Sequence, residues 1–408
     1  MKKTILKNYA ILIVKSGIGL EKGQNVVIRA DLDQTDFVIM LTEECYKAGA
    51  RKVEVEWDVQ RLQKIHQKHR SLKVLSTVEK WEEEKLSHRV KTLPCMIYLL
   101  SEDPDGLNGI DREKYAKSAQ ARYKVIKPYR DKMENRYQWC IAAVPGKAWA
   151  KKMFPDLKVN QAVEKLWEAI LYTSRADGPD PIDAWRKHNE NILNRCKYLN
   201  SLKIESLHIT SSNGTDLKIG LIETSLFLGG REETLSGKPF NANIPSEEVF
   251  TSPDKSKSEG IVYSTKPLSY NGELIENFSV RFEKGKAVEV HAEKNEALLK
   301  QLISMDEGAS YLGEFALVPY DSPIQNSGLI FYNTLFDENA SCHLALGAGY
   351  TNTLDGYEKI SLEECHKLGI NDSMVHEDFM IGTPDLKVVA TSRNGSKTVI
   401  FENGNWSI

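Results

Sequence analysis

The first two hundred residues alternate short apolar runs with long helical patterns, and this alternation restricts the chain to few folds. Strands are predicted at residues 25–30, 51–58, 95–101 and 137–146. Helical patterns lie between them at residues 31–50, 59–90 and 111–135. Strands joined through helices of this length pair in parallel, with helices on the faces of the sheet. The sequence therefore predicts an α/β domain with a largely parallel, helix-covered sheet over residues 1–200.

The second half of the chain has a different pattern. Alternating apolar and polar runs flank Asn213-Gly214, a dipeptide that favours a tight hairpin turn. The same signal recurs at Asn271-Gly272, Asn394-Gly395 and Asn403-Gly404. One clear helical pattern lies at residues 293–306. We therefore expect a boundary near Ser201 and a mainly antiparallel β (α+β) domain over residues 201–408.

Between these parts the pattern is helical from residue 147 to residue 203, with one break. Gly178, Pro179 and Pro181 interrupt it, because proline cannot continue a helix. Asp180 or Asp183 is then the expected cap of the next helix.

Composition excludes several classes of protein. The chain has 408 residues, 41% hydrophobic and 27% charged, which suits a globular protein with more than one core. A net charge of -3 argues against nucleic acid as the main partner. Asn8, Lys15 and Glu21 interrupt the first apolar stretch, so the start is predicted as an amphipathic helix and not as a signal peptide. No apolar run approaches the roughly 20 residues that span a bilayer.

The cysteines also indicate the compartment. The six of them lie far apart and form no C-x-x-C pair, which is typical of unpaired thiols in a reducing cytoplasm. We therefore expect a cytoplasmic protein with no membrane partner. Matches to N-x-S/T, such as Asn339-Ala340-Ser341, are interpreted as chance in the absence of an export signal.

Two further features of the first half argue against a nucleotide-binding site or a metal site there. Neither G-x-G-x-x-G nor G-x-x-x-x-G-K-[ST] occurs, so this α/β half lacks both phosphate-cradling loops although it is wound like a nucleotide-binding domain. His66 and His69 are three residues apart on a helical pattern and are candidates for a shared metal site. Their neighbours are mostly charged or polar, which indicates a solvated helix surface.

Residue types that bind metals concentrate between residues 338 and 378. Within this stretch, residues 374–382 read as a strand, so His376 and Asp378 project from one face and Glu377 from the other. Two ligands placed in this way can share one site. The candidates of the whole stretch are Glu338, His343, Tyr350, His376 and Asp378.

Each candidate also has an ordinary structural interpretation. His343 lies among apolar residues and is compatible with a core histidine bonded to backbone, and Tyr350 is compatible with a packing residue. Cys342 beside His343, and Cys365 beside the next histidine, suggest a thiol nucleophile. Adjacency in sequence is not the spatial pairing that such catalysis requires, so we place no nucleophile there.

Three carboxylates upstream extend the set. Glu247 and Glu248 are adjacent, so in an extended segment they point to opposite sides and at most one joins a given site. Both are also compatible with surface positions. Glu314 stands alone in an apolar run, where a buried carboxylate needs a partner or a metal. A salt bridge to lysine or arginine is its alternative interpretation.

Four segments, in this order and at these separations, resemble the thermophilic-type metalloaminopeptidases known as aminopeptidase T and aminopeptidase S. They are NIPSEEVFTSP, YLGEFALVP, FDENASCHLALGAGY and HEDFMIGTPDL. The resemblance runs over essentially the whole chain. It implies Glu248 and not Glu247 as a ligand, and a position near the metals for Glu338. The implied ligands of a binuclear site are Glu248, Glu314, His343, Tyr350, His376 and Asp378.

The resemblance implies a metal-dependent aminopeptidase. Such an enzyme hydrolyses amino-terminal residues from peptides with a free amino terminus, through water activated by two divalent ions. Carboxylates, imidazoles and a phenol are suitable ligands for Zn, Co or Mn, and they differ from the cysteine-rich ligands of a purely structural zinc site. Glu314 or Glu338 is the expected general base. The resemblance also implies a homodimer, in which the α/β half shapes access and assembly.

Two other functions use the same residue types. A two-metal phosphoesterase needs similar ligands, but the missing phosphate loop disfavours it. A non-enzymatic α/β binding protein would use the histidines and glutamates structurally.

Overall fold

The computed structural model describes residues 2–270 and 272–408. The chain forms two compact units, one of Met1–His188 and Arg231–Ser246 and the other of Asn189–Gly230 and Glu247–Ile408. The first of the three boundaries between them falls inside helix α9 (Pro181–Ser201), because the later turns of that helix contribute to the core of the second unit. The division into domains at residue 200 stays a prediction.

The first unit contains a five-stranded parallel sheet in the order β2-β1-β3-β4-β9. Its strands are β1 (Asn25–Asp31), β2 (Lys52–Asp58), β3 (Cys95–Leu100), β4 (Trp139–Ala143) and β9 (Asn243–Ile244). The first four coincide with the predicted strands, and the predicted parallel pairing is confirmed. Strand β9 was not predicted, because two residues carry no periodicity. A separate pair, β7 (Glu232–Glu233) and β8 (Pro239–Phe240), lies nearby in sequence.

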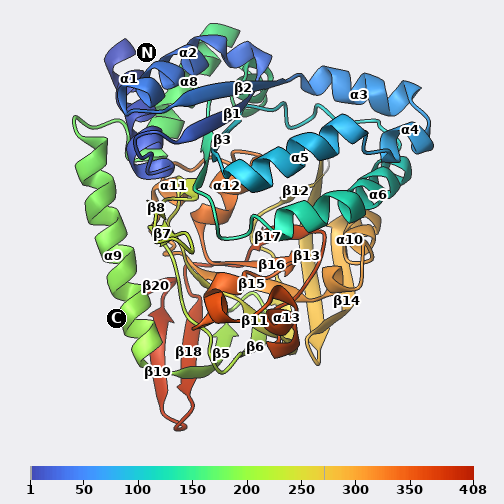
Figure 1. Ribbon diagram of the computed structural model, residues 1–408. Coiled ribbons are helices and arrows are strands. Elements are labelled where there is room, and N and C mark those ends of the chain that lie inside the picture. The colour runs from blue at the N-terminus through green and yellow to red at the C-terminus, as the bar shows by residue number, and fades with distance from the viewer. Residues whose placement is uncertain (1, 271) are drawn as a thin grey trace. The chain divides into compact units, whose positions relative to one another are not determined.

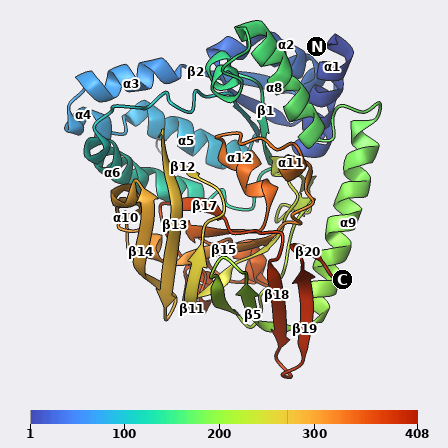
Figure 2. The same ribbon diagram turned by 180° about the vertical axis from the view of Figure 1, so that it is seen from behind.

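Helices cover both faces of this sheet. Aromatic contacts of Tyr9 with Phe37, at 5.7 Å between ring centroids, and with Trp167, at 6.2 Å, join three of the helices. These three, α1 (Lys3–Leu12), α2 (Thr35–Lys47) and α8 (Val159–Thr173), lie on one side of β1 and β2, and α5 (Lys80–Thr92) lies on the other (Figures 1 and 2). The other helices of this unit before α9 are α3 (Gln60–His69), α4 (Leu72–Ser76), α6 (Arg112–Asp131) and α7 (Lys147–Met153).

Capping side chains set several helix ends. The predicted helical region 59–90 forms three helices, since Ser71 caps α4 and Glu79 begins α5 with a capping box. Of the two aspartates proposed as caps of α9, Asp180 has this role, because its Oδ1 accepts from the N–H of Asp183 at 3.1 Å. Among the described residues, no helix is both long and apolar enough to cross a membrane.

The second unit is mainly antiparallel. Its larger sheet has the order β12-β13-β11-β6-β5-β18-β19-β20, and β14 pairs with β13. The hairpin predicted at Asn213-Gly214 is confirmed between β5 and β6, and those at Asn394-Gly395 and Asn403-Gly404 join β18, β19 and β20. Asn271 of the remaining hairpin signal lies outside the described residues. The strands are β5 (Ile204–Thr210), β6 (Asp216–Leu221), β11 (Pro253–Tyr263), β12 (Leu268–Tyr270), β13 (Glu273–Glu283), β14 (Lys286–Lys294), β18 (Lys387–Ser392), β19 (Lys397–Glu402) and β20 (Asn405–Trp406).

A second, four-stranded antiparallel sheet has the order β10-β15-β16-β17. Its strands are β10 (Val249–Thr251), β15 (Leu312–Leu317), β16 (His343–Gly347) and β17 (His376–Met380). Apolar residues of β15, β16 and β17, such as Phe315, Leu344 and Phe379, belong to the main core of this unit. The strand predicted around His376 is therefore confirmed, and this sheet carries the candidate site.

The helices of the second unit are short. They are α10 (Glu296–Leu302), α11 (Pro323–Asn326), α12 (Thr334–Asp337) and α13 (Leu362–Leu368). Helix α10 is shorter than the predicted helix at residues 293–306. Its first part belongs to β14, and Asn295 adopts a left-handed conformation with φ of 60° that separates the strand from the helix.

Candidate metal centre

Three neighbouring strands bring charged side chains to one face of the four-stranded sheet. Glu314 of β15 and Asp378 of β17 both lie opposite Ala345 of β16. Residues directly opposite in a sheet share a face, as do residues two apart on a strand. His343 is two residues before Ala345, and His376 is two residues before Asp378. All four polar side chains therefore project from the same face.

Small residues make room for these side chains. Ala345 stands between Glu314 and Asp378, Ala316 lies opposite His343, and Gly347 lies opposite His376. A large side chain at any of these positions would fill the space in which the polar groups converge. Sequence reasoning did not single out these small residues, although their alternation with His343 along the segment HLALG is a signal that could have identified them.

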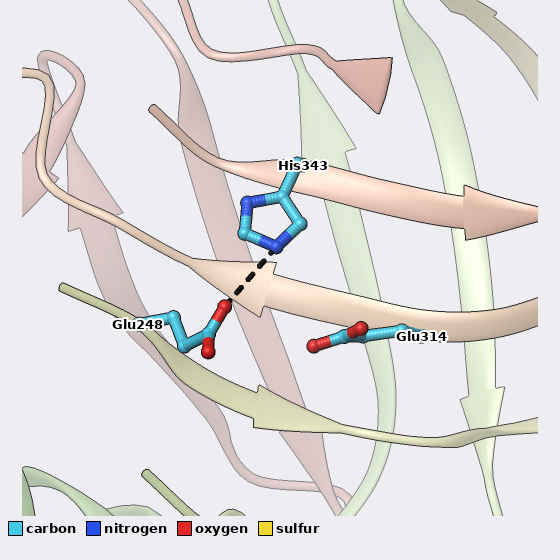
Figure 3. Close-up of side chains that lie close together, drawn as sticks. All are labelled: Glu248, Glu314 and His343. Atoms are coloured by element: carbon cyan, nitrogen blue, oxygen red, sulfur yellow. Dashed lines mark ion pairs between the residues drawn. The ribbon is translucent and has the colours of Figure 1, made fainter. Parts of the chain in front are cut away.

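The polar groups form two clusters that share one member. Glu248, Glu314 and His343 offer one ligand atom each within 4.8 Å of one another, and so do Glu314, His376 and Asp378. His343 Nε2 lies 3.3 Å from Glu248 Oε2, the contact drawn in Figure 3. Figure 3 shows the Glu314 carboxylate pointing toward the same space from the neighbouring strand.

The second cluster is equally compact. His376 Nε2 lies 3.1 Å from Glu314 Oε2 and 3.5 Å from Asp378 Oδ1. Since Glu314 belongs to both clusters, two ions bound there would have it as a common ligand. The two clusters are therefore adjacent, and no other group of three or more ligands of this kind occurs in residues 2–270 and 272–408.

Backbone carbonyls orient both imidazoles. Nδ1 of His376 donates to the Ala348 carbonyl at 2.8 Å, and Nδ1 of His343 donates to the Ser341 carbonyl at 3.3 Å. A carbonyl oxygen only accepts, so the proton of the neutral ring lies on Nδ1. In the neutral ring Nε2 then carries the lone pair, and this is the atom that a metal ion would bind. Neither carbonyl was identifiable from the sequence.

Tyr350 lies at the more open side of the site. Its hydroxyl is 3.1 Å from His376 Nε2. Its backbone N–H donates to Ser252 Oγ at 2.8 Å, and its ring contacts Phe250 at 5.4 Å between centroids. The residue is 38% exposed, whereas Glu314 is 3% exposed. A ligand from solvent would therefore approach past Tyr350.

Glu338 lies beside the clusters without joining either. It occupies a 3₁₀ turn, Glu338–Ala340, and is buried. Asn339 Nδ2 donates to Glu338 Oε1 at 3.3 Å, and Asn339 Oδ1 accepts from the backbone N–H of Glu247 at 2.7 Å. Asn339 thereby links the turn to the Glu247-Glu248 segment. The sequence marks Asn339 only as a chance glycosylation match, and the residue is fully buried.

The structure also separates Glu247 from Glu248. Both are buried, so the surface interpretation of these two carboxylates is wrong. Only Glu248 belongs to a cluster of ligands among the described residues.

Crowding of carboxylates perturbs the acidic groups of the site. Burial, followed by the charges of Asp378 and Glu248, raises the pKa of Glu314 to about 7, against the lowering effect of His376. Burial and the charges of Asp378, Glu248 and Glu314 hold the pKa of Glu338 well above its usual value. Four carboxylates thus converge on a site in which two imidazoles form the ion pairs with Glu248, Glu314 and Asp378.

The pKa values of the two imidazoles are raised as well. Burial by itself lowers the pKa of His343, but the contact with Glu248 and the charges of Asp378 and Glu314 outweigh it and raise that pKa to about 9. The pKa of His376 is likewise held well above its usual value, because Asp378 and Glu314 outweigh burial. The site as a whole favours positive charge.

These residues fit a divalent metal ion. Asp378 Oδ1 is buried and makes no hydrogen bond among the described residues, since its contact with His376 Nε2 is a 3.5 Å ion pair. Burying a carboxylate oxygen without a hydrogen bond is costly. Carboxylate oxygens and correctly oriented imidazole nitrogens are ligands of zinc, cobalt and manganese. A bound ion would satisfy the oxygen and offset the repulsion among the carboxylates.

Other candidates of the sequence lie apart from this centre. His66 and His69 are on α3, and no cluster of ligands includes them in the described part of the chain. Cys342 is buried and its thiol donates to the Val318 carbonyl at 3.4 Å. Burial raises the pKa of the Cys342 thiol to about 12, which suits a structural thiol and not a nucleophile.

Comparisons with known proteins agree with a metal centre. The family described as thermophilic metalloprotease (M29) matches residues 2–406. Aminopeptidase AmpS of Bacillus subtilis is 40% identical over 403 residues, covering 98% of each protein. Aminopeptidase T of Thermus thermophilus is 38% identical over 407 residues, covering 100% of this chain and 99% of that protein.

A solved structure supports the fold. Wild-type AmpT from Thermus thermophilus matches with a TM-score of 0.90 at 37% identity, and the match covers 100% of both chains. The expected combination of a parallel, helix-covered sheet with antiparallel β structure therefore holds for this chain.

Proposed function

This chain belongs to the thermophilic metalloprotease family M29 and is a metalloaminopeptidase, and we propose that its centre holds two divalent ions. The proposed ions are zinc, cobalt or manganese. The observation that carries the proposal is the position of Glu314 in both ligand clusters. The proposed ligands are Glu248, Glu314, His343, Tyr350, His376 and Asp378.

Divalent ions in such a centre lower the pKa of water and polarise a carbonyl oxygen. The chain's own residues supply the rest. Carbonyls of Ser341 and Ala348 fix the tautomer of the two imidazoles. The carboxylate-rich face attracts the positively charged amino terminus of a peptide, which favours cleavage of its first residue.

Glu338 is the group we propose as general base. Glu314 belongs to both ligand clusters, so its oxygens would bind the ions, whereas Glu338 belongs to neither cluster. A base works best with a pKa near the working pH, and burial and neighbouring charges raise the pKa of Glu338. Its carboxylate would take a proton from the attacking water and return it to the leaving amine.

Peptidase activity is tested with aminoacyl anilides. We expect activity to disappear with a chelator and to return with Co, Zn or Mn, while a phosphate ester assayed in parallel remains unhydrolysed. Full activity after thorough metal removal would contradict the metal centre. Elemental analysis should give two ions per chain, and a value of one would contradict the binuclear proposal.

The role of Glu338 is tested with a matched pair of variants. We expect Glu338→Gln to keep its metal and to lose about 10²- to 10⁴-fold in kcat. Glu377→Gln makes the same change on the opposite face of β17 and should stay active. Similar kcat values for both variants would refute the proposed base.

We also propose a cytoplasmic homodimer, which rests on the family resemblance. Light scattering with activity measured at the same low concentration tests the assembly. A fully active monomer would contradict it.

A further inference from the structure

A cavity of about 430 Å³ lies in the first unit, and none of its lining residues belongs to the metal centre. Its wall is formed by residues at the beginnings of neighbouring parallel strands. Asn25 begins β1, Arg51 precedes β2, Leu93 precedes β3 and Gln138 precedes β4. Because parallel strands all begin at the same edge, the cavity lies at the amino-terminal edge of the sheet. Its volume is within the range of small-molecule sites.

The cavity is lined by an excess of positive charge. Arg51, Arg136 and Lys238 contribute to its wall. Arg51 Nε donates to Asn25 Oδ1 at 2.9 Å, which holds the guanidinium at the wall. Arg136 Nη1 makes only a long contact, 3.4 Å, to a backbone carbonyl. Within residues 2–270 and 272–408 neither arginine has a carboxylate partner, so most of their N–H groups remain available.

The third cation is only partly neutralised. Lys238 Nζ lies 3.2 Å from Glu21 Oε2, and the Glu21 side chain is 53% exposed. An exposed ion pair of this kind contributes little and is readily rearranged. The wall therefore carries a net positive charge in a chain whose total charge is -3.

Neutral amides form a fixed part of the wall. Gln138 is 1% exposed, and its Nε2 donates to the Gly19 carbonyl at 3.2 Å. Gln24 Nε2 donates to Gln138 Oε1 at 2.9 Å. Since these amides bond to each other and to backbone, they shape the cavity without neutralising the arginines.

The opposite edge of the sheet is acidic. Asp31 and Asp58 lie at the carboxyl ends of β1 and β2, and Glu102 follows β3. Burial and then the charges of Asp31 and Asp58 raise the pKa of Glu102. Open α/β sheets usually bind ligands at the carboxyl edge, but here that edge repels anions. An anionic ligand of this unit would therefore bind at the amino-terminal edge.

We propose that this cavity binds an elongated small organic anion with one carboxylate or phosphate group near each end. Strands β2 and β4 are three strand spacings apart, about 14 Å, so Arg51 and Arg136 approach the ligand from different ends. Arginine pairs with carboxylate and phosphate through two parallel N–H bonds. One small anion cannot use both arginines fully, whereas an elongated dianion can.

Titration calorimetry of the metal-loaded, full-length protein tests this proposal. The probes are adipate, hexane-1,6-diyl bisphosphate and inorganic phosphate at low salt. We expect saturable binding of adipate or of the bisphosphate, and the tighter of the two identifies the anionic group. Inorganic phosphate should bind at least about tenfold more weakly. Binding should weaken as salt is added.

Variants locate the binding site. Arg51→Gln and Arg136→Gln should each weaken binding about tenfold or more, the loss of one charged contact. Both residues are exposed, so circular dichroism should show an intact fold. Arg61→Gln removes the same charge from the exposed surface of α3 and should bind as the wild type does.

Three results would overturn the proposal. They are the absence of saturable binding of both elongated probes, equal weakening in all three variants, and binding of inorganic phosphate as tight as that of the elongated probes.

Discussion

Replacing Glu314 with glutamine removes one negative charge from the most crowded part of the acidic face. In the metal-free protein this charge is unfavourable, because Glu314 is 3% exposed and faces Asp378 and Glu248. Glutamine has nearly the same shape and keeps an oxygen that can accept from His376. We therefore expect Glu314→Gln to stabilise the metal-free protein while it abolishes metal-dependent turnover.

The size of the stabilisation follows from the pKa. That of Glu314 is raised from 4.5 to about 7, and each pH unit corresponds to about 1.4 kcal/mol. Because the folded-state pKa is the higher one, wild-type stability falls as pH rises from 4.5 to 7, by about 3 kcal/mol in all. Glutamine does not titrate. The variant should therefore match the wild type near pH 4.5 and exceed it by about 3 kcal/mol above pH 7.

Urea unfolding in the presence of a chelator, followed by circular dichroism at pH 5 and pH 8, measures this difference. Glu363→Gln is the control, because that carboxylate is exposed and pairs with Lys367 across a turn of α13. It should show little change at either pH. A stability difference between Glu314→Gln and the wild type that is the same at both pH values would refute the crowding of carboxylates.

Metal loading completes the test. Excess Co or Zn should stabilise the wild type at pH 8 and leave Glu314→Gln nearly unaffected, since the shared ligand is missing. If the variant retains its metal and its kcat, Glu314 is not the common ligand.

Three further predictions follow from the geometry of the site. His343, whose pKa is raised to about 9, must lose a proton when a metal binds, so the affinity of the metal-free protein for Co should rise between pH 7 and pH 9. Calorimetry in buffers of different ionisation enthalpy measures this affinity and the number of protons released. An affinity that falls as pH rises would contradict the prediction. Tyr350→Phe removes the phenol oxygen and should weaken metal binding about tenfold. The fold should be kept, because the residue is 38% exposed. Unchanged affinity in a metal-competition titration would exclude the phenol as a ligand. Gly347→Ala should cost about 3 kcal/mol, since φ is +109° and a Cβ would lie 2.0 Å from the Val375 carbonyl oxygen. Gly356→Ala, with φ of +79° and nothing within 4 Å, should cost about 1 kcal/mol. Equal costs in urea unfolding would show that the close approach at Gly347 is unimportant.

Much of the fold was predictable because its signals are local. Apolar runs and helical patterns identified β1 to β4 and the helical regions between them, and Asn-Gly dipeptides identified three hairpins, β5–β6, β18–β19 and β19–β20. Errors occurred where local signals are weak or compete. Two residues are too few to show the periodic pattern of a strand, so β9 was not predicted. The first residues of the helix predicted at residues 293–306 belong to strand β14.

For the site, the sequence determined which potential ligands were available. It also determined that two of them, His376 and Asp378, lie on the same face of one strand. A strand at residues 376–380 places His376 and Asp378 on one face, whatever the rest of the chain does. The interpretation of Glu314 as a carboxylate that needs a partner followed in the same way from its apolar neighbours.

Only the tertiary structure decided which groups meet. Glu314 and Asp378 face the same space because both lie opposite Ala345, and this register depends on the packing of strands far apart in sequence. The same packing brings Glu248, and not Glu247, to His343, and brings the Ala348 carbonyl to His376. A periodic pattern specifies the face on which a side chain lies, but the register between distant strands is set by the core that they share.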